Sequence, residues 1–106
     1  GKVTTIAGTG QSGNTDGPAL QAKLQYPKAI IVAANGDIYF SDAAGSSIRK
    51  LSSGTVTTLV GSNRGALDGP LSSALFGYIY GLAFDTNGDL IATDYQNHTI
   101  RRITFP

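Results

Sequence analysis

Two aspartates at equivalent places in the chain are the first candidates for chemistry. Asp42 and Asp94 each follow a short apolar run, and they lie 52 residues apart. Two carboxylates can serve as general acid and general base when a fold brings them together. A carboxylate at a strand end can instead accept backbone N–H bonds from the following turn. Because the aspartate recurs in both copies of a repeated pattern, we favour the structural interpretation and predict no catalytic residue.

The other residue types leave few routes to catalysis. The sequence has no cysteine, no glutamate and a single histidine, His98. Thiolate chemistry, cysteine-bound zinc and a zinc-binding histidine triad within one chain are therefore excluded. Residues 85–89 share letters with a calcium-binding loop, but that loop needs a glutamate, so we interpret them as a hairpin turn. We predict no metal site, no cofactor and no enzymatic activity.

One alternative interpretation is a metal-dependent enzyme. Asp37 and Asp89 follow equivalent turns, and aspartates that converged in a central channel could hold a metal ion for metal-dependent chemistry. We rank this interpretation below a non-enzymatic one.

Four basic residues recur on one expected strand of each copy, namely Arg49, Lys50, Arg101 and Arg102. Multiplied by symmetry, they could form a basic belt that binds RNA. The formal net charge is only +1, however, and the basic residues are not interleaved with aromatic ones. We therefore interpret them as a solvated outer face and do not expect a nucleic-acid partner.

Aromatic and amide side chains suggest a candidate ligand face. Tyr78, Tyr80, Tyr95 and Lys28 are its main members, with Tyr26 and Asn14 behind them. Such groups suit recognition of a carbohydrate or a peptide. For Tyr26 and Tyr78 we favour the alternative that their rings pack between layers of the fold.

Two copies of one pattern define the elements that must position these residues. The spacing is 53 residues near the start and 52 from Asp16 onward, with about sixteen identical positions. Alternating or β-branched runs predict strands at residues 2–7, 29–32, 37–41, 47–51, 55–60, 81–84, 89–93 and 99–104. The Asn-Gly pairs at 35–36 and 87–88 predict tight hairpins with positive φ angles. Residues 16–24 and 68–76 each predict a short helical turn with aspartate as N-cap.

Repeated units of about fifty residues with four antiparallel strands are typical of propeller blades. We therefore predict an all-β fold, a β-propeller with two four-stranded antiparallel blades per chain. Residues 26–42 and 87–103 also resemble the NHL repeat, and the second includes the Asn97-His98 pair found in that family's name. The first copy departs from it with Gly45 and Ser46. The resemblance implies that residues 29–32 form the innermost strand of a blade and 55–60 the outermost.

The domain prediction follows from this order. Residues 1–106 form a single segment, with repeat one at 1–53 and repeat two at 54–106. It begins with an outermost strand and ends with three inner ones. Two blades cannot close a ring. Leaving the apolar faces at both ends exposed to water would cost a free energy on the order of 10 kcal/mol. We expect strand 2–7 of one chain to complete the last blade of the next. The positions expected to pair are Lys2, Val3, Thr4, Thr5, Ile6 and Ala7 with Ile100, Arg101, Arg102 and Ile103.

The expected partner is therefore the chain itself. Three copies would give six blades and four would give eight, and we favour the homotrimer over the homotetramer. The alternative is an excised fragment that is monomeric or poorly folded alone. No apolar run approaches the roughly 18 residues of a membrane span, so no membrane partner is expected. Composition leaves the compartment open.

The function we predict is a non-enzymatic, self-assembling scaffold or binding module, natural or engineered. The alternative is a fragment of an NHL domain that binds carbohydrate, peptide or RNA. NHL propellers share an architecture while serving many functions, so the resemblance specifies the fold far better than the ligand.

Overall fold

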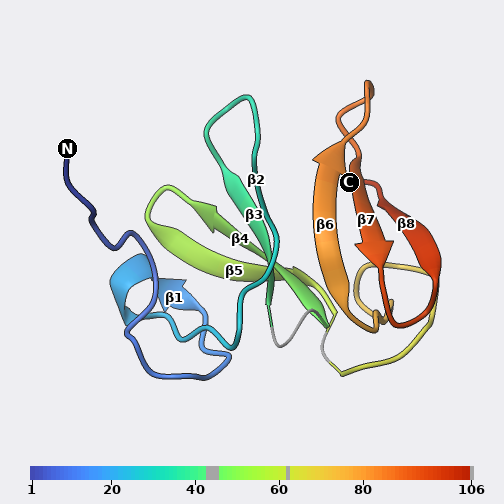
Figure 1. Ribbon diagram of the computed structural model, residues 1–106, viewed down its shortest axis with the longest axis horizontal. Helices are drawn as coiled ribbons and strands as arrows, with labels where there is room; N and C mark the ends of the chain where they lie inside the picture. The colour runs from blue at the N-terminus through green and yellow to red at the C-terminus, as the bar shows by residue number, and fades with distance from the viewer. Residues whose placement is uncertain (43–45, 62, 106) are drawn as a thin grey trace.

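The computed structural model describes residues 1–42, 46–61 and 63–105, and Gly45 lies outside them. Figure 1 shows two antiparallel sheets standing side by side. The elements are β1 (Gly17–Pro18), the 3-10 helix η1 (Ala19–Gln21), β2 (Ile30–Val32), β3 (Ile38–Asp42), β4 (Ser47–Ser52), β5 (Thr55–Val60), β6 (Ile79–Phe84), β7 (Leu90–Asp94) and β8 (Thr99–Ile103). No α-helix occurs among the described residues, which confirms the all-β prediction.

The strand order confirms one predicted blade and leaves the other one strand short. The first sheet has the order β1-β5-β4-β3-β2, so β2 to β5 form a four-stranded meander with β1 added outside β5. The second sheet contains only β6, β7 and β8, with the outer edge of β8 unpaired among the described residues. The second sheet therefore has the three inner strands that were expected at the end of the chain, and the fourth strand of that blade was expected from another copy.

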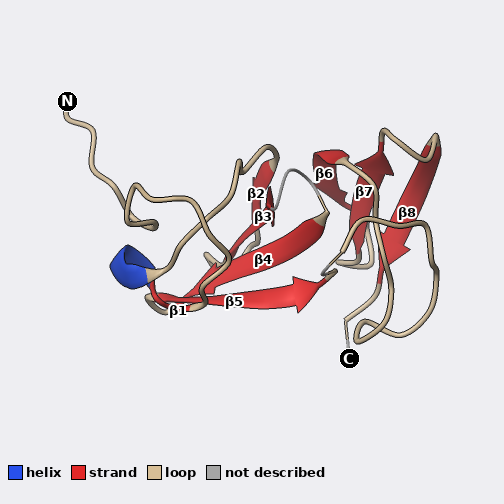
Figure 2. Ribbon diagram, turned by 90° about the horizontal axis from the view of Figure 1, so that it is seen from below, coloured by secondary structure: helices blue, strands red, loops and turns tan. Residues whose placement is uncertain are grey.

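The expected strand at residues 2–7 is absent from the structure. This segment has no strand assignment, and the side chain of Val3 is 99% exposed. Its copy β5 is a strand that pairs with β4, whereas residues 2–7 pair with no strand in the part of the chain that the structure describes. In Figures 1 and 2 the N-terminus and β8 lie at opposite ends of the molecule. The sequence can form a strand, but this chain alone offers it no partner.

Both predicted hairpins form, although by a different turn geometry. Gly36 and Gly88 have φ values of 95° and 82°, while the preceding asparagines do not have positive φ. The N–H of Gly36 donates to the carbonyl of Ala33, and the N–H of Ala33 donates to the carbonyl of Asp37. This is a three-residue connection in which glycine alone takes the left-handed conformation.

The main core lies between the two sheets. Tyr39 and Ile48 from the first sheet pack with Ile79 and Leu90 from the second. The Tyr39 ring meets the Phe84 ring edge to face, with 6.0 Å between ring centroids. Burying each such side chain contributes about 1.5–3 kcal/mol, so the sheets hold each other in place.

The segments before the inner strands differ from the helical turns that were predicted. Of the described residues only those of η1 are helical, and the N-cap of η1 is Pro18 without a side-chain cap bond. Asp16 does not cap it, because its carboxylate binds Arg49 instead. The side chain of Phe76, at the end of the second of these segments, is 2% exposed and packs in the core between the sheets.

Candidate functional site

The aspartate at the end of β3 is the centre of a buried ion-pair network. Asp42 Oδ2 lies 2.7 Å from Arg49 Nη1, with side-chain exposures of 0% and 1%. The N–H of Gln25 donates to Asp42 Oδ1 over 2.8 Å. The second guanidinium nitrogen, Nη2, lies 2.8 Å from Asp16 Oδ1. The arginine thereby ties β4 to the end of β3 and to the turn before β1.

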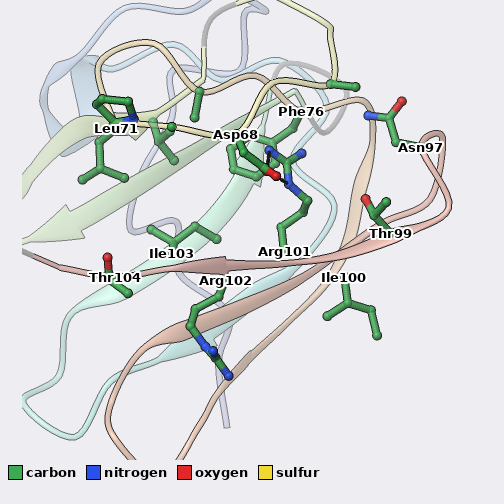
Figure 3. Close-up of a pocket in the computed structure, with 15 residues that line it drawn as sticks. Asp68, Leu71, Phe76, Asn97, Thr99, Ile100, Arg101, Arg102, Ile103 and Thr104 are labelled. Carbon is green, nitrogen blue, oxygen red and sulfur yellow. Dashed lines mark hydrogen bonds and ion pairs between the residues drawn. The ribbon is translucent and has the colours of Figure 1, made fainter.

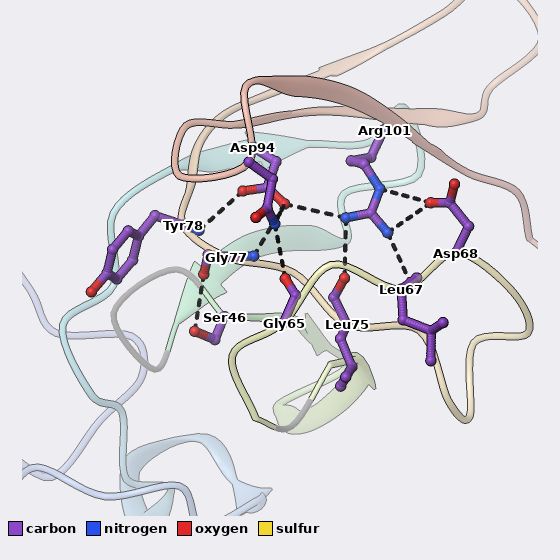
Figure 4. Close-up of polar contacts among 10 residues, drawn as sticks. Ser46, Gly65, Leu67, Asp68, Leu75, Gly77, Tyr78, Asp94 and Arg101 are labelled. Atoms are coloured by element: carbon purple, nitrogen blue, oxygen red, sulfur yellow. Dashed lines mark hydrogen bonds and ion pairs between the residues drawn. The ribbon is translucent and has the colours of Figure 1, made fainter.

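The second repeat contains the same three-residue network, shown in Figure 4. Arg101 Nη1 lies 3.2 Å from Asp94 Oδ2, and its Nη2 lies 2.9 Å from Asp68 Oδ1. The backbone N–H groups of Gly77 and Tyr78 donate to Asp94, both over 3.1 Å. The network therefore anchors the entrance to each inner strand.

Electrostatics keep Asp94 ionised. Burial raises its pKa, but hydrogen bonds from the Gly77 and Tyr78 N–H groups and from Asn97 outweigh burial, and the net pKa is lowered from 3.8. A carboxyl group whose pKa is lowered further below neutral pH is poorly matched to proton transfer there. The contacts of Asp42 and Asp94 are those of structural carboxylates, and the absence of a catalytic role stays a prediction. The bonds come largely from the segment before the inner strand, not from the following turn as predicted.

The predicted solvated basic face is wrong for two of its four members. Arg49 is buried and the Arg101 side chain is only 10% exposed, while Lys50 and Arg102 are 34% and 63% exposed. Strand alternation sends successive side chains to opposite faces. On the face of Arg49, the carbonyls of Lys23 and Thr15 accept its N–H groups at 2.7 and 3.0 Å. Within one chain, the four residues therefore do not form a continuous belt.

Asp37 is also held by neighbours. The Ser52 hydroxyl donates to its carboxylate over 2.6 Å, and Lys50 Nζ lies 3.6 Å away. The Ser52 hydrogen bond is the main cause of a lowered pKa for this carboxyl. No group of three or more His, Cys, Asp or Glu residues in the part of the chain that the structure describes could hold a metal ion. None of the described helices is long and apolar enough to cross a membrane.

Three members of the predicted ligand face come together. The rings of Tyr80 and Tyr95 stack with centroids 4.9 Å apart and an interplanar angle of 13°. Lys28 Nζ lies 5.2 Å from the centroid of Tyr80. The two tyrosines are 51% and 64% exposed, which leaves aromatic surface open to solvent. We call Lys28, Tyr80 and Tyr95 the tyrosine cluster.

The other tyrosines lie elsewhere. Tyr78 is half-buried, and the Arg64 guanidinium sits 4.1 Å from its ring centroid. Tyr26 is 68% exposed, so the expectation that it packs between layers is wrong in this chain. Its side of the first sheet has no neighbouring blade, and that explains the exposure.

A groove that the sequence did not predict runs along the outer edge of β8 (Figure 3). Its volume is about 600 Å³. Asp68, Gly69, Pro70 and Leu71 line one side, and Arg101, Arg102, Ile103 and Thr104 line the other. The repeated Asp-Gly-Pro triplet was the available signal, since Gly17 and Pro18 of the first triplet pair with the outermost strand β5 and the second triplet lines the groove.

Comparison with known proteins gave consistent matches. The family model for the Teneurin NHL domain matches residues 4–79. The chloroplastic protein SUPPRESSOR OF QUENCHING 1 of Arabidopsis thaliana is 36% identical over 94 residues, covering 86% of this chain and 9% of that protein.

Solved structures match over almost the whole chain. An auxiliary nutrient binding protein from Bacteroides thetaiotaomicron is 27% identical with a TM-score of 0.81, covering 93% of this chain and 28% of that one. Another auxiliary nutrient binding protein, from Bacteroides ovatus, is 29% identical with a TM-score of 0.77, over 89% of this chain and 26% of that one. The chain thus spans about a quarter of these structural neighbours.

Proposed function

The chain belongs to the Teneurin NHL domain family of NHL-repeat proteins, and from that premise we propose that it is a non-enzymatic binding and scaffold module. Its propeller ring is completed by further copies of itself. A homotrimer with six blades is the favoured assembly, and a homotetramer with eight blades is the alternative.

The observation that carries this proposal is a large difference in exposure between two isoleucines at equivalent places in the repeat. Ile48 on β4 is 0% exposed, because the second sheet covers it. Ile100 takes the same place on β8, 52 residues later, and is 75% exposed. The same side chain at the same place in the repeat is expected to be buried in both, and only a further blade can bury Ile100.

The opposite end of the molecule also exposes apolar side chains that are packed in the other repeat. Ile30 and Val32 on β2 are 66% and 59% exposed. Their equivalents on β6, Leu82 and Phe84, pack against the core between the sheets. The exposed apolar face of the second sheet is therefore complementary to the exposed apolar face of the first sheet. A second copy, placed as the second sheet lies on the first, would bury both faces by a head-to-tail contact that can close into a ring.

Light scattering on a size-exclusion column tests the proposal. We expect a mass of about three times 11.0 kDa for the chain. Ile100→Asp should shift the mass to that of one chain, because a charge would be buried in the contact. The matched control is Leu20→Asp, since Leu20 on η1 is 60% exposed and its repeat equivalent Ser72 stays exposed where the two sheets pack together. A monomeric wild-type chain would remove self-assembly from the proposed function.

The tyrosine cluster favours a second role for the assembled ring, namely binding of a neutral or acidic oligosaccharide. Exposed, stacked aromatic rings offer a flat apolar surface for sugar rings, and Lys28 adds a hydrogen-bond donor and a charge. Tyr80 is the second residue of the inner strand β6. The N–H of Tyr95 donates to the carbonyl of Tyr78 over 2.8 Å. The cluster is therefore held on backbone that the Asp94 network fixes.

Amide NMR shifts during titration with cello-, malto-, xylo- and oligogalacturonate fragments test this role. We expect shifts confined to the cluster, and a loss of binding of about tenfold or more in Tyr95→Ala. Tyr26→Ala is the control, because that tyrosine is equally exposed but has no aromatic stacking partner among the described residues. An absence of shifts with every fragment up to about 10 mM would remove the oligosaccharide role.

A further inference from the structure

We propose that the groove beside β8 is an acceptor slot for residues 2–7 of a second copy, in the register that β5 adopts on β4. This inference rests on the self-assembly proposed above and names the partner segment, the groove and the residue pairs. It accounts for two features at once, the exposed N-terminal segment and the edge of β8 that no described strand pairs with.

The first sheet shows what fills the equivalent groove. There β5 lies between β4 on one side and β1 on the other. Arg49 pairs with Thr58, Lys50 with Thr57 and Leu51 with Val56 across the β4–β5 ladder. In the second repeat, Gly69 and Pro70 correspond to β1, and β8 corresponds to β4. The space between them is the groove of about 600 Å³.

The N-terminal segment has the sequence that this groove requires. Residues 54–61 read Gly-Thr-Val-Thr-Thr-Leu-Val-Gly, and residues 1–8 read Gly-Lys-Val-Thr-Thr-Ile-Ala-Gly. Transfer of the β4–β5 register by the repeat spacing gives three defined pairs. They are Arg101 with Thr5, Arg102 with Thr4, and Ile103 with Val3 of the other copy.

The side chain of Val3 would change its environment most. Val56, its equivalent, is 0% exposed and packs with Ala22 and Phe40. The equivalent of Ala22 is Ala74, which lines the groove. Val3 is 99% exposed in the single chain and would be buried there.

Asp68 supplies a polar test of the register. Its equivalent Asp16 accepts two hydrogen bonds from Thr58, one from the N–H over 3.0 Å and one from the hydroxyl over 3.1 Å. The Asp68 side chain is 92% exposed and already binds Arg101 through one oxygen. In the proposed register, the N–H and hydroxyl of Thr5 from the second copy would bind Asp68 in the same way.

If residues 2–7 fill this groove, they must come from another molecule. Residues 8–24 run along the far side of the first sheet, where the N–H of Gly8 donates to the carbonyl of Ala19. The N-terminus and β8 lie at opposite ends of a molecule whose longest extent is 37 Å (Figure 1). The segment cannot reach the β8 of its own chain while the two sheets remain folded.

Disulfide trapping between two single-cysteine variants tests the register, because the wild-type chain has no cysteine. Directly opposed residues of neighbouring antiparallel strands lie within disulfide range. A mixture of Thr4→Cys and Arg102→Cys chains should give a covalent heterodimer, located by peptide mass spectrometry. The control mixture, Thr4→Cys with Ile100→Cys, places the second cysteine two residues away on the same face. Equal or preferred trapping in the control would overturn the proposed register.

A labelled peptide of residues 1–8 separates this inference from the ring itself. If the chain is a monomer, the ring is overturned, but its empty groove should still bind the peptide in an anisotropy titration. If the chain is a ring, the peptide should compete and lower the mass. A peptide carrying Thr5→Val should bind about five- to tenfold more weakly, because the hydroxyl bond to Asp68 is lost. A peptide that neither binds nor competes would overturn the slot, whatever the mass of the chain.

Discussion

Replacing Arg49 by methionine should lower the free energy of unfolding by about 3–5 kcal/mol, a large part of the stability of a small domain. The reason is Asp42, whose side chain is 0% exposed and whose Oδ2 lies 2.7 Å from the guanidinium. Methionine keeps much of the apolar stem but leaves a buried carboxylate without its counter-charge. Urea unfolding followed by circular dichroism measures the loss.

Two further variants separate the ion pair from general packing. Arg102→Met should change the free energy of unfolding by less than about 1 kcal/mol, because that side chain is 63% exposed. The double variant Arg49→Met with Asp42→Leu should recover part of the loss, since it removes the uncompensated charge as well. A double variant no more stable than Arg49→Met alone would show that the buried charge is not the cause.

The repeated architecture could be predicted because its signals are local. Gly36 and Gly88 take the left-handed conformation that a hairpin of this length needs, and the alternating runs beside them form strands. Such signals act over a few residues and do not depend on what lies across the fold. The order of strands in the first blade followed from them.

The burial of Arg49 could not be predicted in the same way. Its strand carries Lys50 next to it, and charge alone does not say which of the two faces a covering loop. Arg49 is buried because the segment before the inner strand supplies carbonyl groups and Asp16 to its guanidinium. The joint recurrence of Asp16, Asp42 and Arg49 as Asp68, Asp94 and Arg101 was the signal available in the sequence.

The segment at residues 2–7 shows a different limit. Its sequence matches β5 closely, yet it has no strand conformation here. Strand propensity describes a tendency to fit a sheet edge, and the edge must come from elsewhere in the fold or from another molecule. For the tyrosine cluster, residue type brought Tyr80 and Tyr95 into one prediction, while their stacking joins the start of β6 to the residue after β7 and has no local signal in the sequence.

The two equivalent isoleucines give the second large effect, because the same change to alanine at the two positions reports on two different interfaces. Ile48→Ala should lower the free energy of unfolding by about 2–5 kcal/mol at any chain concentration, since Ile48 is 0% exposed within the chain. Ile100→Ala should cost less than about 0.5 kcal/mol in dilute chain, where that side chain is 75% exposed.

Concentration then distinguishes the interfaces. As the chain concentration rises into the range where copies associate, wild type gains stability by mass action, and Ile100→Ala should gain less. Urea midpoints of wild type and Ile100→Ala, measured over about a hundredfold range of chain concentration, would record this difference in stability gain. Midpoints for Ile100→Ala that stay parallel to wild type would mean that no blade ever covers Ile100. The burial of Ile48 would then be a property of its own sheet pair and not of the repeat.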